Sequence, residues 1–243
     1  MIPRAWAAAA LLAVVALAAV ACGGARGSGP VTVLGAASLV DVLPRIDPAA
    51  RHSFAGSDTL VAQVREGVPA DVVAAADVAL VRMLHDEGLV GPPRVFATNR
   101  LVLLVPRGNP ARVSGVADLD RPGIVFVMAD AGVPAGDAAR RVLATLARSD
   151  LVGAAASQEP DVRAVAQKVA LGEADAGFAY ATDAVAVEDV DAIGLPAAGV
   201  PRTEYAAAVL RDSPRHEAAA AHLARLVGPE GRAALSRAGF GTP

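Results

Sequence analysis

The sequence predicts an α/β protein of two lobes, each lobe a mostly parallel sheet flanked by helices. Apolar β-rich runs alternate with helix-compatible segments along nearly the whole chain, which is the pattern that parallel sheets produce. The 243 residues exceed what one lobe of about 100 residues requires. Hydrophobic residues make up 54% of the chain but aromatic ones only 3%, so Ala and Val are expected to fill the core.

Composition excludes three classes of protein. The mean hydropathy of +0.44 suggests a membrane protein, but no apolar run of about 18 residues follows the N-terminal segment. The abundant apolar surface excludes a disordered chain. A basic face for nucleic acid is not expected either, because the formal net charge is −3.

Residues 1–21 read as a lipoprotein export signal. Arg4 supplies the positive start, and Ala5 to Val20 is an uncharged apolar stretch that is too short and too early for a membrane-spanning helix. The end, Ala19-Val20-Ala21-Cys22, resembles the bacterial lipoprotein site at which the cysteine becomes lipidated. An ordinary signal peptide is the alternative.

Cys22 is the single cysteine of the chain, so an internal disulfide is excluded. Residues 22–30 are Gly- and Ser-rich and predict a flexible tether, by which Cys22 would anchor an exported domain to the outer face of the cell membrane. Loss of residues 1–21 removes Arg4, which leaves 21 basic and 25 acidic residues and a formal charge of −4.

Strands and helices follow one another from Val31 onward. Strands are predicted at Val31–Ala36, Arg51–Phe54, Asp71–Ala75, Arg100–Pro106, Gly123–Met128, Gly177–Tyr180, Val190–Leu195 and Glu204–Leu210. Helices are predicted after Ser38, which is placed to cap one, and at 59–66, 77–87, 135–148, 161–171, 214–227 and 229–238, with a further one from Thr182. The chain is expected to cross between lobes near Pro106 and near Pro201–Tyr205. The N-terminal lobe would then hold residues 31–105 and 205–243, and the C-terminal lobe residues 106–204.

Enzyme motifs are missing from the sequence. It contains no GxSxG elbow, P-loop or HExxH pattern. The four histidines, His52, His85, His216 and His222, lack metal-ligand spacing and are expected on the solvated surface. A hydrolase using Ser38 or Ser57 is the remaining enzyme alternative, and it would need a base that the neighbouring loops do not supply.

An anion site is the better-supported chemistry. Four loops follow strands and open helices, and such loops converge at the carboxyl ends of parallel strands. Each helix start offers N–H groups without helical partners and about half a positive charge, so several together bind an anion without Lys or Arg. The loops are Ala37-Ser38, Gly56-Ser57, Pro134-Ala135 and Asp161-Val162. Ser38, Ser57 and Tyr180 would add hydroxyl donors. Taken alone, each serine is more often a helix cap and the tyrosine more often a packing residue, and it is their combination that favours a binding site.

Six motifs follow in an order that resembles the periplasmic molybdate-binding proteins, the substrate receptors of molybdate ABC importers. They are Ala36-Ala37-Ser38-Leu39, Ser53-Phe54-Ala55-Gly56-Ser57, Val68-Pro69-Ala70-Asp71-Val72, Val133-Pro134-Ala135-Gly136, Asp161-Val162-Arg163 and Gly177-Phe178-Ala179-Tyr180-Ala181-Thr182-Asp183-Ala184. The series covers nearly the whole mature chain.

The resemblance implies a type II periplasmic-binding-protein fold with the oxyanion in the cleft between lobes. Ser38 and Ser57 would each donate a backbone N–H and a hydroxyl, Ala135 and Val162 a backbone N–H, and Tyr180 its phenol. Molybdenum would enter only as molybdate through these residues, with no separate cofactor and no catalysis.

The same resemblance implies the partners: molybdate and tungstate as ligands and the permease of an ABC importer, with the receptor itself a monomer. A receptor for sulfate or phosphate stays open as an alternative. The chain departs from the family in the short segment between Ser38 and Ser57, in Ala129-Asp130-Ala131, and in Asp58, which brings a carboxylate beside the site. Asp58 is expected to face solvent or to cap its own helix.

Overall fold

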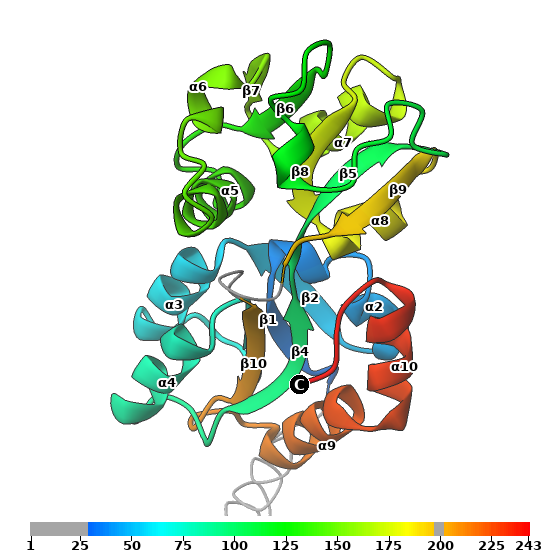
Figure 1. The fold of residues 1–243 in the computed structure, drawn as a ribbon. Coiled ribbons are helices and arrows are strands. Elements are labelled where there is room, and N and C mark those ends of the chain that lie inside the picture. The colour runs from blue at the N-terminus through cyan, green and yellow to red at the C-terminus, as the bar shows by residue number, and fades with distance from the viewer. Residues whose placement is uncertain (1–28, 197–201) are drawn as a thin grey trace, which may run out of the picture.

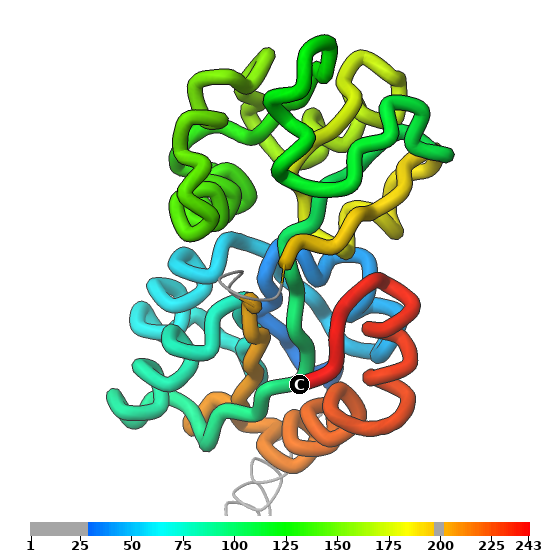
Figure 2. The backbone as a smooth tube through the Cα atoms, viewed as in Figure 1, coloured from blue at the N-terminus to red at the C-terminus, as the bar shows by residue number. Residues whose placement is uncertain are grey.

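A computed structural model describes residues 29–196 and 202–243. Two lobes lie one above the other and are joined by strands that run between them (Figures 1 and 2). The predicted signal and most of the predicted tether lie outside the described residues. Within the described ranges, no helix is both long and apolar enough to cross a membrane.

The first sheet has the strand order β2-β1-β3-β10-β4. Its strands are β1 (Thr32–Ala36), β2 (Arg51–Ala55), β3 (Val72–Ala75), β4 (Arg94–Asn99) and β10 (Thr203–Val209). β1 pairs in parallel with β2 and β3, whereas β10 is antiparallel to both β3 and β4. One strand, contributed by the late part of the chain, therefore opposes the other four.

The second sheet repeats this arrangement with the order β7-β6-β8-β5-β9. Its strands are β5 (Leu101–Pro106), β6 (Phe126–Ala129), β7 (Ser157–Glu159), β8 (Ala176–Tyr180) and β9 (Val190–Gly194). β6 is parallel to β7 and β8, and β5 is antiparallel to β8 and β9. Both sheets are thus mostly parallel, as predicted.

Helices cover both faces of each sheet. Against the first sheet lie η1 (Ala37–Leu39), α2 (Leu43–Ile46), α9 (His216–Val227) and α10 (Pro229–Arg237) on one face and α3 (Ser57–Arg65) and α4 (Val78–Asp86) on the other. Against the second lie η2 (Val116–Asp118), α5 (Pro134–Thr145) and α6 (Leu151–Ala154) on one face and α7 (Val162–Ala170) and α8 (Ala181–Ala186) on the other.

Small residues let helices and strands approach closely in these cores. A side chain at Gly177 of β8 would place its Cβ 2.6 Å from Cγ1 of Val165 on α7, closer than any real contact. The Ala and Val content therefore reflects thin, tightly packed layers rather than a lipid-facing surface.

The first crossing between lobes lies at Arg100, not near Pro106, so the predicted boundary after residue 105 is wrong. β4 ends at Asn99 in the first sheet and β5 begins at Leu101 in the second. A strand is predicted from the sequence at Arg100–Pro106 but none at Arg94–Asn99, where the polar Thr98 and Asn99 break the apolar pattern, so β4 and the crossing were missed. The return follows β9, and β10 begins at Thr203, two residues before the predicted lobe boundary.

Of the histidines expected on the surface, His222 is buried and His52 is partly buried. His222 is 2% exposed, and its Nδ1 lies 2.8 Å from Oδ2 of Asp47. Burial opposes ionisation of Asp47, but the hydrogen bond and charge of His222, together with the nearby Arg225, outweigh it and lower the pKa of this carboxyl. His52 stacks on Phe54 with ring centroids 5.8 Å apart. A charged partner far along the chain thus offsets the cost of burying His222. The spacing of residues in the sequence does not indicate this pairing.

Asp71 fastens the first lobe at the start of β3. Its side chain is fully buried and accepts hydrogen bonds from Thr32 N (2.7 Å), Ser213 Oγ (2.6 Å) and Arg215 Nε (3.0 Å). Burial disfavours the charged carboxylate, yet these bonds prevail and lower its pKa below the ordinary 3.8. Asp71 therefore ties β1 and the segment before α9 to the centre of the sheet.

Replacement of Asp71 by Ala should lower the free energy of unfolding by about 3 kcal/mol, because it leaves buried donors and Arg215 without their partner. Urea denaturation at neutral pH measures this. Since the native pKa is lowered, the stabilisation exists above about pH 4 and is lost as the pH falls through the native value. The difference between wild type and variant should therefore shrink in acid.

Asp77→Ala is the matched control. Asp77 is exposed and accepts only the Ala79 N–H at the start of α4 (2.7 Å), so its loss should cost about 1 kcal/mol. Equal losses in the two variants would contradict the role given to Asp71.

Candidate functional site

The carboxyl ends of the parallel strands in both lobes lie beside the crossing strands. Ser38, just after β1, has its Oγ 3.0 Å from the phenol oxygen of Tyr205 on β10. Tyr180, the last residue of β8, pairs in register with Leu101, the first residue after the crossing. Loops from the two lobes thus reach the same region of the molecule, where the lobes adjoin (Figure 1).

Ser38 and Ser57 occupy equivalent places on neighbouring strands. The last register pair of β1 and β2 is Ala36 with Ala55, and each serine stands two residues beyond it. Ser57 begins α3, and its Oγ accepts a hydrogen bond from Ala76 N at 3.0 Å. Because that oxygen is held as an acceptor, the Ser57 hydroxyl hydrogen is available to a further partner.

Ser38 does not cap a helix, contrary to the sequence prediction. It lies inside the short 3₁₀ turn η1, with Ala36 at the N-cap position, and its side chain is committed to Tyr205 instead. Gly56 occupies the N-cap of α3, so α3 starts two residues earlier than predicted. The short segment before Ser57 shortens the first helix to four residues, while β2 keeps five.

Ala135 and Val162 both stand in the first turn of a helix in the second lobe, where N–H groups lack helical acceptors. The N-cap of α7 is Asp161, which accepts from Ala164 N at 2.9 Å and leaves the Val162 N–H to other partners. A Cβ at Gly136 would lie 2.2 Å from the Asp130 carbonyl oxygen. Glycine is therefore needed for α5 to begin directly against the end of β6.

Tyr180 contributes a phenol that stays protonated. Burial raises its pKa to about 12, and the nearby Tyr205 acts in the same direction while Arg141 opposes it. Its backbone N–H donates to Asp183 Oδ2 at 2.8 Å, which fixes the start of α8. Burial also raises the pKa of Asp183, and Arg163 partly offsets this. At neutral pH the phenol is therefore a hydrogen-bond donor.

Sequence reasoning missed Tyr205 and Asn99, which lie behind the donors. Each is only 3% exposed, and Asn99 Nδ2 donates across the lobes to Thr182 Oγ1 at 3.0 Å. Their place in the sequence could have indicated them, since both residues flank a crossing between lobes. Asp58, by contrast, is exposed in the first turn of α3.

Metal and nucleophile chemistry find no support in the described ranges. They contain no group of three or more His, Cys, Asp or Glu side chains arranged to hold a metal ion. His52 pairs with the opposite end of β1 from Ser38, because its register partner is Val33, and His222 is bound to Asp47. His85 bonds the Val90 carbonyl, and His216 is exposed at the start of α9.

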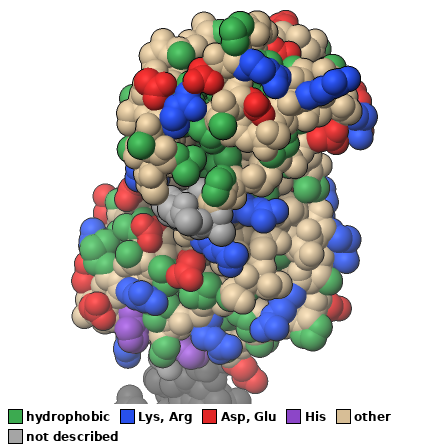
Figure 3. Space-filling model, in the orientation of Figure 1, with side chains coloured by type: hydrophobic (Ala, Val, Ile, Leu, Met, Phe, Trp, Pro, Cys, Tyr) green, Lys and Arg blue, Asp and Glu red, His purple; other side chains and the backbone are tan. Residues whose placement is uncertain are grey.

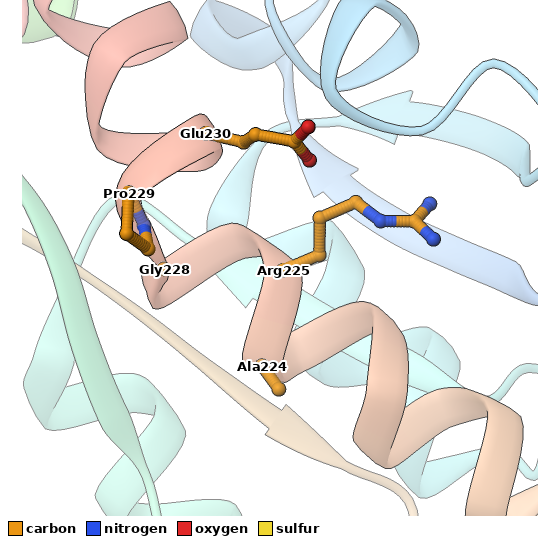
Figure 4. Close-up of a pocket in the computed structure, with 5 residues that line it drawn as sticks. All are labelled: Ala224, Arg225, Gly228, Pro229 and Glu230. Carbon is orange, nitrogen blue, oxygen red and sulfur yellow. The ribbon is translucent and has the colours of Figure 1, made fainter.

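A hollow elsewhere on the described part of the molecule lies apart from these donors. Acidic and basic side chains are interspersed over both lobes on the face shown in Figure 3. A hollow of about 260 Å³ lies at the α9–α10 junction, lined by Ala224, Arg225, Gly228, Pro229 and Glu230 (Figure 4). It contains none of the donors described above, and Arg225 is already paired with Asp47 at 3.0 Å.

Comparison with known proteins agrees with this architecture. Residues 48–241 match the family described as bacterial extracellular solute-binding protein. Molybdate-binding protein ModA of Mycobacterium tuberculosis (strain H37Rv) is 34% identical over 91% of this chain and 88% of its own length. Molybdate-binding protein ModA of Escherichia coli K12 is 27% identical over 87% and 89%.

Solved structures share the fold. The substrate-binding domain of a putative molybdenum ABC transporter from Clostridium difficile superposes with a TM-score of 0.79 at 24% identity, covering 89% of this chain and all of that one. The periplasmic molybdate-binding protein of Azotobacter vinelandii gives 0.69 at 20% identity over 88% and 99%. The two-lobed type II fold is thereby confirmed, and these relatives are binding proteins rather than enzymes. The chain belongs to the bacterial extracellular solute-binding proteins, in the family of the molybdate-binding protein ModA.

Proposed function

We propose that this protein captures molybdate, and tungstate with it, between its two lobes. Ser38 and Ser57 would donate from the first lobe, and Ala135, Val162 and Tyr180 from the second. The observation that carries the proposal is that these hydroxyl and N–H donors stand at the carboxyl ends of parallel strands in both lobes, beside the crossings. The relatives that are named as molybdate-binding proteins support molybdate as the ligand.

The donor set suits a fully deprotonated dianion. Molybdate carries no proton at neutral pH and offers only acceptors, whereas phosphate still carries a proton that needs an acceptor from the protein. Leaving such a proton buried without a partner costs about 1–3 kcal/mol. Tyr180 remains a donor because its pKa is raised to about 12, so the site keeps its donor character throughout the physiological range.

Dipoles and hydroxyls can supply the necessary affinity. A hydrogen bond to a charged group contributes about 1.5–3 kcal/mol, and a micromolar complex corresponds to about 8 kcal/mol. Three or four such bonds match that value, and the remaining donors offset desolvation and the ordering of two lobes. Binding therefore does not require a lysine or arginine in contact with the anion.

The division of the donors between the two lobes offers a way to couple binding to delivery. Only a closed arrangement brings both sets onto one anion, so the ligand favours closure, and the permease of an ABC importer would recognise the closed form. We further propose that the receptor is a monomer tethered through lipidated Cys22 to the outer face of the membrane. Cys22 lies outside the described ranges.

Thermal unfolding with a panel of oxyanions tests the ligand. Molybdate or tungstate at a hundred times its Kd should stabilise the mature protein by about 2.7 kcal/mol, seen as a rise in Tm. Sulfate and phosphate at the same concentration should shift Tm far less. A clear shift with sulfate or phosphate and none with molybdate or tungstate would assign the protein to another oxyanion.

Gly136→Ala tests whether the start of α5 holds the ligand. The added methyl group would meet the Asp130 and Ala129 carbonyls at 2.2 and 2.4 Å, so the first turn must shift and carry the Ala135 N–H away. Molybdate binding by calorimetry should weaken about tenfold, which is about 1.4 kcal/mol.

Gly153→Ala is the control for this change. Gly153 lies in α6 with open space around its missing Cβ, so binding should stay at the wild-type value. Wild-type affinity in Gly136→Ala, with the fold intact by circular dichroism, would remove α5 from the site.

A further inference from the structure

A line of buried polar groups leads from the first crossing to Ser38. The Arg100 N–H donates to Asn99 Oδ1 at 2.9 Å. Tyr205 stands on β10, which pairs with β4, and its phenol oxygen lies 3.0 Å from Ser38 Oγ. Asn99 and Tyr205 are each 3% exposed, so water does not compete for these bonds.

The donors in this line can be ordered. Because Asn99 Oδ1 accepts from Arg100, the side of the amide that faces other groups is its NH₂, which also donates to Thr182 Oγ1 at 3.0 Å. In the proposed site Ser38 gives its own hydrogen to the anion, so Tyr205 is the donor in the hydrogen bond between the phenol and Ser38 Oγ. The Ser38 hydroxyl hydrogen is left to point away from Tyr205.

We propose that Tyr205 is a specificity-determining positioning residue that turns the Ser38 hydroxyl hydrogen toward the anion. A serine free to rotate can accept from a protonated oxyanion as well as donate to a bare one. With one lone pair accepting from Tyr205 and its hydrogen turned toward the anion, Ser38 favours oxyanions without a proton. This inference rests on the proposed function and adds the means by which the site rejects hydrogen phosphate.

Two properties of Tyr205 suit this role. Burial raises the pKa of its phenol, although the hydrogen bond with Ser38 acts in the opposite direction, so the hydrogen it must donate is retained. Its ring is held edge-on by Phe96 and Phe240, with centroids 6.2 and 5.3 Å away. Replacement by Phe therefore removes the hydroxyl and keeps the packing of the ring.

The test compares molybdate with phosphate in wild type and Tyr205→Phe, with phosphate measured as a competitor of molybdate at neutral pH. The variant should bind molybdate about tenfold more weakly and phosphate no more weakly than wild type. The ratio of the phosphate to the molybdate Kd should therefore fall about tenfold. A merely structural role would weaken both anions alike and leave the ratio unchanged.

A double-mutant cycle gives a second readout that needs molybdate alone. If Tyr205 acts through the Ser38 hydroxyl, Tyr205→Phe should change the molybdate Kd less than about twofold in a Ser38→Ala background. Thr98→Val is the control, because Thr98 is a buried neighbour of Asn99 whose hydroxyl bonds only the Thr242 carbonyl, at 3.4 Å. It should leave both the ratio and the cycle unaffected.

The outcomes separate this inference from the function on which it rests. Molybdate binding by wild type, with an unchanged ratio and full additivity in the cycle, overturns the inference alone. Binding of sulfate in place of molybdate overturns the proposed ligand, and the same cycle with sulfate then decides the role of Tyr205. A wild type that binds no tetrahedral oxyanion overturns both.

Discussion

The direction of the strands at the two crossings is the constraint on which the molecule depends. Each sheet takes one antiparallel strand, β10 or β5, from beyond a crossing, so each crossing joins an edge strand of one sheet (β4 or β9) to the strand next to the edge of the other. The carboxyl ends of β1 and β8 come to the same place, as the bond from Ser38 to Tyr205 and the pairing of Tyr180 with Leu101 record. The first turns of helices from both lobes therefore lie beside the crossings, and their position is set by the strand directions rather than by attraction between charges.

Small residues make this gathering compact. Gly136 lets α5 begin against the end of β6, and Gly177 lets α7 lie directly on β8. The high hydrophobic and low aromatic content of the chain has the same origin, since thin layers need Ala, Val and Gly. A net negative receptor can hold an anion in this way because backbone N–H groups at helix starts supply partial positive charge that the net charge does not count.

Local pattern was enough to predict the α/β class, the two lobes and the strand-to-helix loops that bear Ser38, Ser57, Ala135, Val162 and Tyr180. What it could not predict depends on partners far along the chain. Ser38 bonds Tyr205 across 167 positions, and the pairing of His222 with Asp47 spans 175, so neither leaves a periodic signal. The crossing at Arg100 was missed for a different reason: β4 ends in the polar residues Thr98 and Asn99, so its sequence does not show the apolar pattern of a buried strand.

Diffraction at the molybdenum absorption edge, from crystals grown with molybdate, would locate the bound anion. We expect one molybdenum peak between the lobes, with the hydroxyls of Ser38, Ser57 and Tyr180 and the N–H groups of Ala135 and Val162 within hydrogen-bond distance of the anion. No arginine nitrogen should touch it. A peak held directly by Arg141 or Arg163, or one in the hollow between α9 and α10, would contradict the account.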